Sequence, residues 1–291
     1  MIELLKTHMD EHNLTQRQVA DQLEVSPAQV NQYLKGVYAG DVPKLEIKIK
    51  QLIERTREKI LDKSNFGYVE TPKSKQAMDM IRYVHVEYDI LLITGGAGLG
   101  KTQTLKEYAR RYTDVILIET APSYTAKVLL KELCQKLGVD DRGSLHTMSE
   151  AIVAKLKFSK RLIMIDEAEL LPYRALETLR RIHDKAEVGL VLAGLPRLLM
   201  NLKGSHGQHA QLYSRVGYHY QFGDKLDAQD IYALATSTLG TDEFNETLFK
   251  ACGANARRLN KLLRGAIRLS KINKCNINEE MIQKFSTMLI H

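Results

Sequence analysis

The chain has 291 residues, of which 44% are hydrophobic and 26% charged, and its formal net charge is +7. This composition is typical of a soluble globular protein, and the longest apolar runs are far too short to cross a membrane, so we expect no membrane partner. The three cysteines are far apart in the sequence, which fits a reducing cytoplasm and argues against a disulfide framework or a cysteine metal site. The basic balance favours a polyanionic partner.

Residues 1–62 have a helical pattern and contain a helix-turn-helix signature, "TQRQVADQLEVSPAQVNQYLKG", at 15–36. Thr15 can cap the first helix, and Ser26, with Pro27 at the first helical position, can cap the second. Glu24 occupies the turn position where glycine is common. The residues expected to face inward have the spacings of two short crossed helices: Val19, Ala20, Leu23, Val25, Val30 and Tyr33.

The second helix of this motif is expected to contact double-stranded DNA. It would present four polar side chains to the duplex, namely Gln29, Asn31, Gln32 and Lys35. Residues 1–62 nevertheless hold nine basic and ten acidic residues, a net charge of −1. DNA affinity rests heavily on phosphate neutralisation. A helical module that packs on or binds another protein therefore stays open as the alternative.

The middle of the chain predicts an α/β fold. After a predicted linker at 63–75, short apolar runs alternate with helical stretches from 76 to 223, as in a parallel sheet with right-handed crossovers. A helix within 123–138 should end at Gly138, and 203–211 is expected to be a mobile loop. The five expected strands, of which the last alternates like an edge strand, are 90–94, 115–119, 161–166, 188–194 and 216–222.

A glycine-rich loop follows the first of these strands. This loop matches the P-loop pattern, with Gly95, four further residues and then Gly100-Lys101-Thr102. A P-loop binds a nucleoside triphosphate through successive backbone N–H groups at a helix N-terminus. Lys101 would bring a positive charge to the β- and γ-phosphates, and Thr102 would offer its hydroxyl to Mg²⁺. The predicted ATP-binding residues of the loop are Gly95, Gly96, Ala97, Gly98, Leu99, Gly100, Lys101, Thr102 and Gln103.

A pair of acids follows the third predicted strand, in "RLIMIDEAEL". An acid at the carboxyl end of a buried parallel strand faces the ligand crevice, so Asp166 is expected to help hold Mg²⁺. Glu167 is expected to orient and deprotonate an attacking water molecule as the catalytic base. The alternative, that the two acids only cap the following helix, is weaker because a P-loop lies in the same chain. Glu169 is expected to be a surface acid or one that supports the site indirectly.

Residues 224–291 are expected to be helical, and part of this region is strongly basic. Arg257, Lys261, Arg264, Arg268 and Lys271 recur at steps of four, three, four and three, so they share one face of a helix. Such a stripe of like charges is relieved by a polyanion. We therefore predict that Lys261, Arg264, Arg268 and Lys271 bind DNA. The alternative is an ordinary solvated helix face.

The P-loop, "IDEAE" and later arginines occur in the order found in AAA+ ATPases, which the chain resembles over about residues 64–291. The resemblance implies a five-stranded parallel sheet with a small helical lid. It also implies that Arg215, before the fifth strand, reaches the γ-phosphate bound by a neighbouring subunit, with Arg180 and Arg181 as rivals. Arg257, or second Arg258, would reach the nucleotide from the lid. Ala193 and Gly194 stand where many relatives carry a polar side chain on the fourth strand.

A closer resemblance is to the target-selection ATPases of transposing phages and transposons, the family of the phage Mu B transposition protein. It rests on the small helical domain, "GYVETPKSKQAMDMI", "VLAGLPRLL" and "GANARRLNKLLRGA". It implies an ATPase of the bacterial host cytoplasm that forms helical homo-oligomers on DNA, largely regardless of sequence, and delivers target DNA to a transposase. The implied domains are a helix-turn-helix domain (1–62), a linker (63–75), the AAA+ domain (76–223) and a helical lid (224–291).

Two other functions remain open at the level of sequence. A helicase loader or replication initiator would share the ATPase but recruit a helicase instead of a transposase. A nucleotide-responsive transcription regulator would bind one specific operator through residues 15–36. Both share the predicted ATP and Mg²⁺ site, so that site alone does not separate them.

Overall fold

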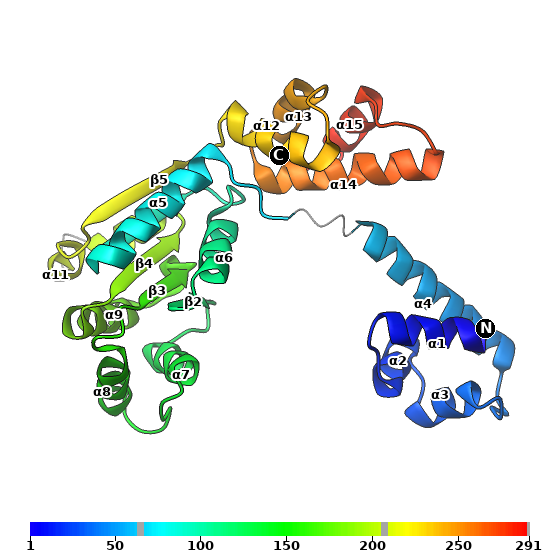
Figure 1. The fold of residues 1–291 in the computed structure, drawn as a ribbon, viewed down its shortest axis with the longest axis horizontal. Coiled ribbons are helices and arrows are strands. Elements are labelled where there is room, and N and C mark those ends of the chain that lie inside the picture. Colours follow the sequence, from blue (N-terminus) through cyan, green and yellow to red (C-terminus); the bar gives the residue numbers. More distant parts are fainter. Residues whose placement is uncertain (63–66, 205–208, 290–291) are drawn as a thin grey trace. The chain divides into compact units, whose positions relative to one another are not determined.

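The computed structural model describes residues 1–62, 67–204 and 209–289, and it divides the chain into two compact units between residues 66 and 67 (Figure 1). Each unit is described by itself below. Within these three ranges no helix combines the length and the apolar character that crossing a bilayer requires.

Residues 1–62 of the first unit form the helices α1 (Ile2–Glu11), α2 (Gln16–Leu23), α3 (Pro27–Leu34) and α4 (Val42–Asp62). Thr15 and Ser26 each form a capping box at the start of α2 and α3, as predicted. Glu24, at the turn between them, has φ +55°, the left-handed conformation that glycine adopts most easily. The core is apolar and includes every predicted inward residue except Val25, which is partly buried: Leu5, Val19, Ala20, Leu23, Val30, Tyr33, Leu45, Ile49 and Ile53.

The second unit is built on one parallel sheet with the strand order β2-β3-β4-β1-β5. The fully buried strands β1, β3 and β4 are continuous apolar runs, whereas β5 lies at an edge and alternates in burial, as its sequence predicts. All five predicted strands are confirmed within two residues: β1 (Ile90–Gly95), β2 (Val115–Glu119), β3 (Leu162–Asp166), β4 (Gly189–Gly194) and β5 (Tyr218–Gly223).

Helices cover both faces of this sheet. On one face, α5 (Pro72–Glu87) and α6 (Lys101–Arg111) contact each other and the strands. The other face buries alternate strand residues against α7 (Ala126–Leu137), α8 (Leu145–Leu156) and α9 (Tyr173–Ala186). Gly138 ends α7 with φ +67°, as predicted. Two short helices follow β4, α10 (Arg197–Lys203) and α11 (Ala210–Tyr213); between them, residues 205–208 of the predicted loop lie outside the described residues.

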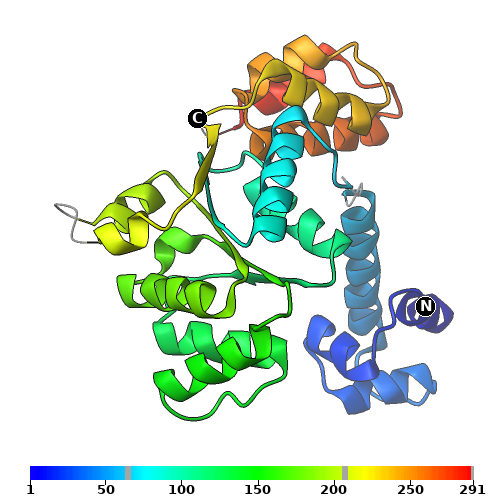
Figure 2. The ribbon, with the colours of Figure 1, turned by 60° about the vertical axis from the view of Figure 1, so that its left-hand side comes forward.

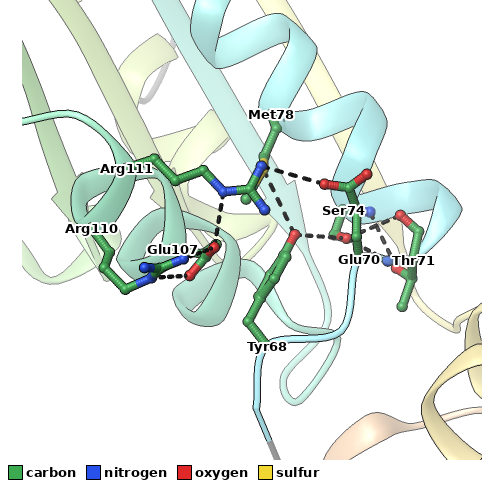
Figure 3. A network of polar contacts seen from close by, with 8 residues as sticks. All are labelled: Tyr68, Glu70, Thr71, Ser74, Met78, Glu107, Arg110 and Arg111. Atoms are coloured by element: carbon green, nitrogen blue, oxygen red, sulfur yellow. Dashed lines mark hydrogen bonds and ion pairs between the residues drawn. The ribbon is translucent and has the colours of Figure 1, made fainter. Parts of the chain in front are cut away.

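The segment before α5 contacts Ser74 of α5 and Arg111 of α6 (Figure 3). Tyr68 donates a hydrogen bond from its hydroxyl to Ser74 Oγ at 3.0 Å, and the Arg111 guanidinium lies 5.7 Å from the centre of its ring. Thr71 and Ser74 form a capping box at the start of α5. The predicted linker at 63–75 therefore overlaps this helix, which begins at Pro72; residues 63–66 lie outside the described residues.

The described residues after β5 form a group of helices at the end of the second unit (Figure 2). These helices are α12 (Ala228–Leu239), α13 (Asn245–Cys252), α14 (Ala256–Asn273) and α15 (Glu279–Ser286). Helix α14 is the longest of them and buries Leu259, Leu262, Leu263 and Ala266 against its neighbours. In the described residues after β5 there is no strand, as the sequence predicts.

Candidate nucleotide-binding site

The glycine-rich loop connects the carboxyl end of β1 to the first residue of α6. Gly98 and Gly100 have φ of +78° and +101°, values that side-chain-bearing residues rarely adopt. A side chain at position 95 is excluded for a steric reason, since a Cβ there would lie 2.6 Å from Phe222 Cβ. The backbone N–H groups of this loop and the N-terminus of α6 together suit an anion, because both present partial positive charge.

Lys101, the first residue of α6, folds its side chain back over the loop. Its ammonium donates hydrogen bonds to the carbonyl oxygens of Gly95 and Gly96, each at 2.7 Å. Burial lowers the pKa of Lys101, while the nearby Asp166 and Glu169 carboxylates act in the opposite direction. The ammonium is therefore held within the loop, where a triphosphate would be bound. Thr102 and Gln103 follow in the first turn of α6.

Asp166 ends β3 and is only 3% exposed. Its Oδ1 accepts a hydrogen bond from the Glu167 N–H at 3.0 Å, but its Oδ2 is buried with no hydrogen-bond partner. A buried, unpaired carboxylate oxygen is costly unless a cation or donor binds it. This orphaned oxygen fits the predicted Mg²⁺ site, which Thr102 and the phosphates would complete. Among the described residues there is no group of three or more metal-binding side chains.

Glu167 projects from the turn after β3 with φ +54° and is exposed. Although the residue as a whole is exposed, partial desolvation of its carboxyl group raises its pKa, and the neighbouring Asp166, Glu169 and Glu119 carboxylates raise it further. A raised pKa suits a residue that must accept a proton. The turn is fixed by Thr120, whose hydroxyl lies 3.0 Å from Asp166 O and 2.8 Å from Glu167 O. Sequence reasoning missed Thr120, although its position directly after β2 places it at the same sheet edge.

Glu169 is not a surface acid. Its side chain is 4% exposed, and its Oε2 is buried without a hydrogen-bond partner. The carboxylate occupies the space beside Gly194, where a Cβ would collide with Oε2. The surface alternative considered from sequence is therefore wrong, because the one-turn helix η1 (Ala168–Leu170) directs this side chain inward to the end of β4.

The three candidate trans-acting arginines differ in exposure. Arg180 is 12% exposed at its side chain and is held by both Glu177 and Asp184. Arg181 is 69% exposed and donates to Glu177 at 3.0 Å. Arg215, three residues before β5, is 60% exposed and lies 3.9 Å from Asp184. Arg180 is thus committed within its own subunit, whereas Arg215 and Arg181 are accessible.

The lid helix α14 meets the glycine-rich loop directly. Its N-cap residue, Asn255, donates from Nδ2 to the Ala97 carbonyl at 2.8 Å, while its Oδ1 accepts the N–H groups of Arg257 and Arg258. The Arg257 N–H also lies 3.3 Å from Gly98 O. This contact places the Arg257 backbone at the loop and makes it the better placed of the two predicted lid arginines. Sequence reasoning missed Asn255; its only signal was an asparagine before a helix.

The predicted DNA-binding residues divide into two groups of different accessibility. Gln32 on α3 and Lys35, the residue that ends this helix, are exposed. Asn31 is half-buried, and Gln29 uses its Oε1 to accept a hydrogen bond from Ser26 N at the start of the helix. Gln29 is thus engaged within the fold. On α14, the four predicted basic side chains Lys261, Arg264, Arg268 and Lys271 are all exposed, as is Arg257 at the loop end of the same helix.

Comparison with known proteins agrees with this architecture. A family model described as an AAA domain matches residues 84–202, and a model described as helix-turn-helix matches residues 5–46. Among solved structures, the ORC2 protein of Aeropyrum pernix is similar with a TM-score of 0.63 and 16% identity, over 78% of this chain and 71% of that one. The RuvB motor of Thermotoga maritima has a TM-score of 0.52 and 16% identity, over 76% and 70%. At these identities the likeness concerns the fold alone.

Two relatives are more similar in sequence. The Mu-like prophage FluMu DNA transposition protein B of Haemophilus influenzae is 31% identical over 254 residues, which cover 84% of this chain and 87% of that protein. The ATP-dependent target DNA activator B of Escherichia phage Mu is 30% identical over 240 residues, covering 79% and 75%. The chain therefore belongs to the family of the DNA transposition proteins B of Mu-like phages, and it is an AAA+ ATPase with an N-terminal helix-turn-helix domain.

Proposed function

We propose that this protein uses Mg²⁺-dependent ATP hydrolysis to control an oligomer on double-stranded DNA, and that the oligomer delivers target DNA to a transposase in the bacterial host cytoplasm. The observation that carries the proposal is the orphaned Asp166 Oδ2 at the end of β3, two strands from the glycine-rich loop. It occurs in a chain 30% identical to a protein named as an ATP-dependent target DNA activator.

In the proposed mechanism, the loop N–H groups and Lys101 bind the phosphates of ATP. Thr102 and Asp166 hold Mg²⁺, which when bound neutralises charge on the β- and γ-phosphates. Glu167 orients a water molecule and accepts its proton, since its raised pKa makes it a stronger base than an ordinary carboxylate. Arg257 approaches the same phosphates from the lid. The products are ADP and phosphate.

We further propose that each site is completed by Arg215 of a neighbouring subunit. A guanidinium stabilises charge on the transferring phosphoryl oxygens. The exposure of Arg215 supports this role over Arg180, which is engaged by Glu177 and Asp184. Hydrolysis then depends on neighbouring subunits, and a filament on DNA provides them.

DNA would be bound chiefly by the basic face of α14, with Gln32 of α3 and the following Lys35 as a second contact. Both sets of side chains are exposed. Contacts to phosphates are insensitive to sequence, so this arrangement would accept many target sites. Asn31 and Gln29 would contribute less, because they are half-buried.

Electron microscopy with ATP, Mg²⁺ and random duplex DNA tests this function. We expect ordered protein-coated DNA that disassembles as ATP is hydrolysed. A Glu167→Gln variant should form the same assembly and retain it, because nucleotide binds but the water is not activated. Absence of any ATP-dependent assembly would contradict the filament.

A sequence-specific regulator is a second candidate, favoured by the helix-turn-helix match at residues 5–46. Footprinting on long DNA separates the two, because a regulator protects one discrete site and a filament protects DNA continuously. The likeness to an ORC2 protein concerns the fold alone. Co-purification tests whether the protein is instead a helicase loader or initiator, since such a protein would retain a helicase and not a transposase.

A further inference from the structure

The fourth strand of the sheet lacks a polar side chain at its carboxyl end, yet that end is not apolar. Gly194 is the last residue of β4, and it pairs with Thr94, the residue before the glycine-rich loop begins. Since β4 lies between β3 and β1, its end lies between Asp166 and Gly95. A group placed there stands in the middle of the proposed site.

Glu169 supplies a carboxylate at this position. The side chain is almost fully buried, its Oε2 has no hydrogen-bond partner, and it fills the space that a side chain on residue 194 would need. The Cδ of the carboxylate would lie 3.1 Å from a Cβ on Gly194. A larger residue at position 194 would therefore displace the Glu169 carboxylate.

The position of Glu169 is held from α10. Asn201 donates a hydrogen bond from Nδ2 to the Glu169 carbonyl at 3.0 Å, and an Arg197 guanidinium nitrogen lies 3.9 Å from Glu169 Oε1. These contacts fix the backbone and engage one carboxylate oxygen, while the other oxygen remains without a partner. A buried acceptor without a protein partner is satisfied by a water molecule or an ion, or marks a functional group.

We propose that Glu169 is a positioning residue for ATP hydrolysis, and that its free carboxylate oxygen accepts a hydrogen bond from the attacking water molecule in place of a polar side chain on β4. This inference rests on the proposed function. Water is the appropriate donor, because a carboxylate has no proton to offer to phosphate oxygens and would repel them. Arg197 offsets part of the negative charge.

In this step the water oxygen forms a bond to the γ-phosphorus as the bond from that phosphorus to the β,γ-bridging oxygen breaks. One water proton passes to Glu167, and ADP and phosphate leave. Glu169 takes no proton; it restricts the direction from which the water attacks. Loss of such alignment costs on the order of 100-fold in rate.

Compensating substitutions test the proposal. Glu169→Ala should lower kcat about 100-fold while the equilibrium affinity for a fluorescent ATP analogue with Mg²⁺ remains at the wild-type value. Gly194→Ser in the Glu169→Ala background places a hydroxyl in the vacated space and should recover at least about tenfold in kcat. The matched control, Glu169→Ala with Gly194→Ala, fills the same space without a polar group and should recover nothing.

Several outcomes would overturn the proposal. The first is a wild-type kcat in the Glu169→Ala variant. The second is equal recovery of kcat when Gly194 is replaced by Ser or by Ala in the Glu169→Ala background. The third is a fall in ATP affinity and thermal stability of Glu169→Ala that accounts for the lost rate. If Glu169→Ala does not fold, Glu169→Gln keeps the shape and should still lower kcat, because the amide is a weaker acceptor than a carboxylate. If the wild-type protein does not hydrolyse ATP, the proposed function itself is wrong. If the wild-type protein hydrolyses ATP and the Glu169 variants have the same kcat, only the proposed role of Glu169 is wrong.

Discussion

Asn255 Nδ2 donates a hydrogen bond to the carbonyl oxygen of Ala97 at 2.8 Å, and this bond joins the lid helix α14 to the glycine-rich loop. The residues are 158 positions apart in the chain. A Cβ on Gly98 would lie 2.7 Å from Asn255 Oδ1, so α14 can approach the loop this closely because residue 98 has no side chain. The helix that carries the basic stripe is thereby attached at its N-terminus to the proposed phosphate site.

Replacing Asn255 with Ser should weaken nucleotide binding. Serine still caps α14 but is too short to reach Ala97, so only the bond to the loop is lost. A net hydrogen bond contributes about 0.5–1.5 kcal/mol, which corresponds to roughly a two- to tenfold rise in the Kd for an ATP analogue. Asn278 is the N-cap of α15, and its side chain accepts a hydrogen bond from the Met281 N–H in the first turn of that helix. Asn278→Ser is therefore the control and should leave the Kd unchanged; equal effects in both variants would contradict the coupling.

Mixing two inactive variants tests whether Arg215 acts in trans. Arg215→Ala keeps its own nucleotide site but lacks the donated guanidinium, and Lys101→Ala has a damaged site but an intact Arg215. Each alone should hydrolyse ATP at least about 1,000-fold more slowly than wild type. The mixture should recover activity, since a Lys101→Ala subunit can supply Arg215 to a neighbour. Two outcomes would contradict this role. An Arg181→Ala variant that is inactive alone and recovers with Lys101→Ala would identify Arg181 as the trans-acting arginine, and no recovery with Arg215→Ala would indicate a different arginine or a site complete within one subunit.

The basic face of α14 should account for much of the salt dependence of DNA binding. Changing Lys261, Arg264 and Lys271 to Ala should weaken binding to all sequences alike, because the contacts are to phosphates. Each lost phosphate contact should reduce the slope of log K against log salt by about 0.9. A control with the same loss of charge replaces three exposed lysines of α7, Lys127, Lys131 and Lys136. An unchanged slope in the α14 variant, or an equal change in the α7 variant, would exclude this face as the contact.

Glu107 should stabilise the second unit in a pH-dependent way. Its carboxylate accepts hydrogen bonds from Arg110 at 2.7 Å and Arg111 at 2.8 Å (Figure 3), and the first of these is the main cause of a pKa lowered from 4.5 to about 2. Because the folded-state pKa is depressed, the stabilisation is complete above about pH 4.5 and is lost as the pH falls toward 2.

Glu107→Gln should accordingly lower the free energy of unfolding at pH 7 by roughly 1–2 kcal/mol, a figure that allows for screening of the exposed arginines. The difference from wild type should shrink as the pH falls below 4.5. Urea denaturation at several pH values measures it. Glu150→Gln, which removes an exposed pair with Lys185, is the control and should change stability little. A deficit that stays constant with pH would show that Glu107 acts through packing.

Local patterns determined the elements of this protein and the chemistry of its loop. The positive-φ glycines at 98 and 100, the apolar runs of the strands and the capping residues Thr15 and Ser26 act over a few neighbouring positions, where backbone conformation and burial period decide the structure. For the same reason all five strands could be predicted, with errors confined to their ends. A resemblance of motifs in order was sufficient for the family.

What only the tertiary structure decided are the contacts between groups far apart in the chain. The inward direction of Glu169 depends on a bare Gly194 in a neighbouring strand, and the role of Asn255 depends on Ala97. Arg180 differs from Arg215 in its burial and in its close pairing with both Glu177 and Asp184. Sequence spacing encodes which face of one helix or strand a residue occupies. It does not encode which element packs against that face, because the path of the chain between elements sets that partner.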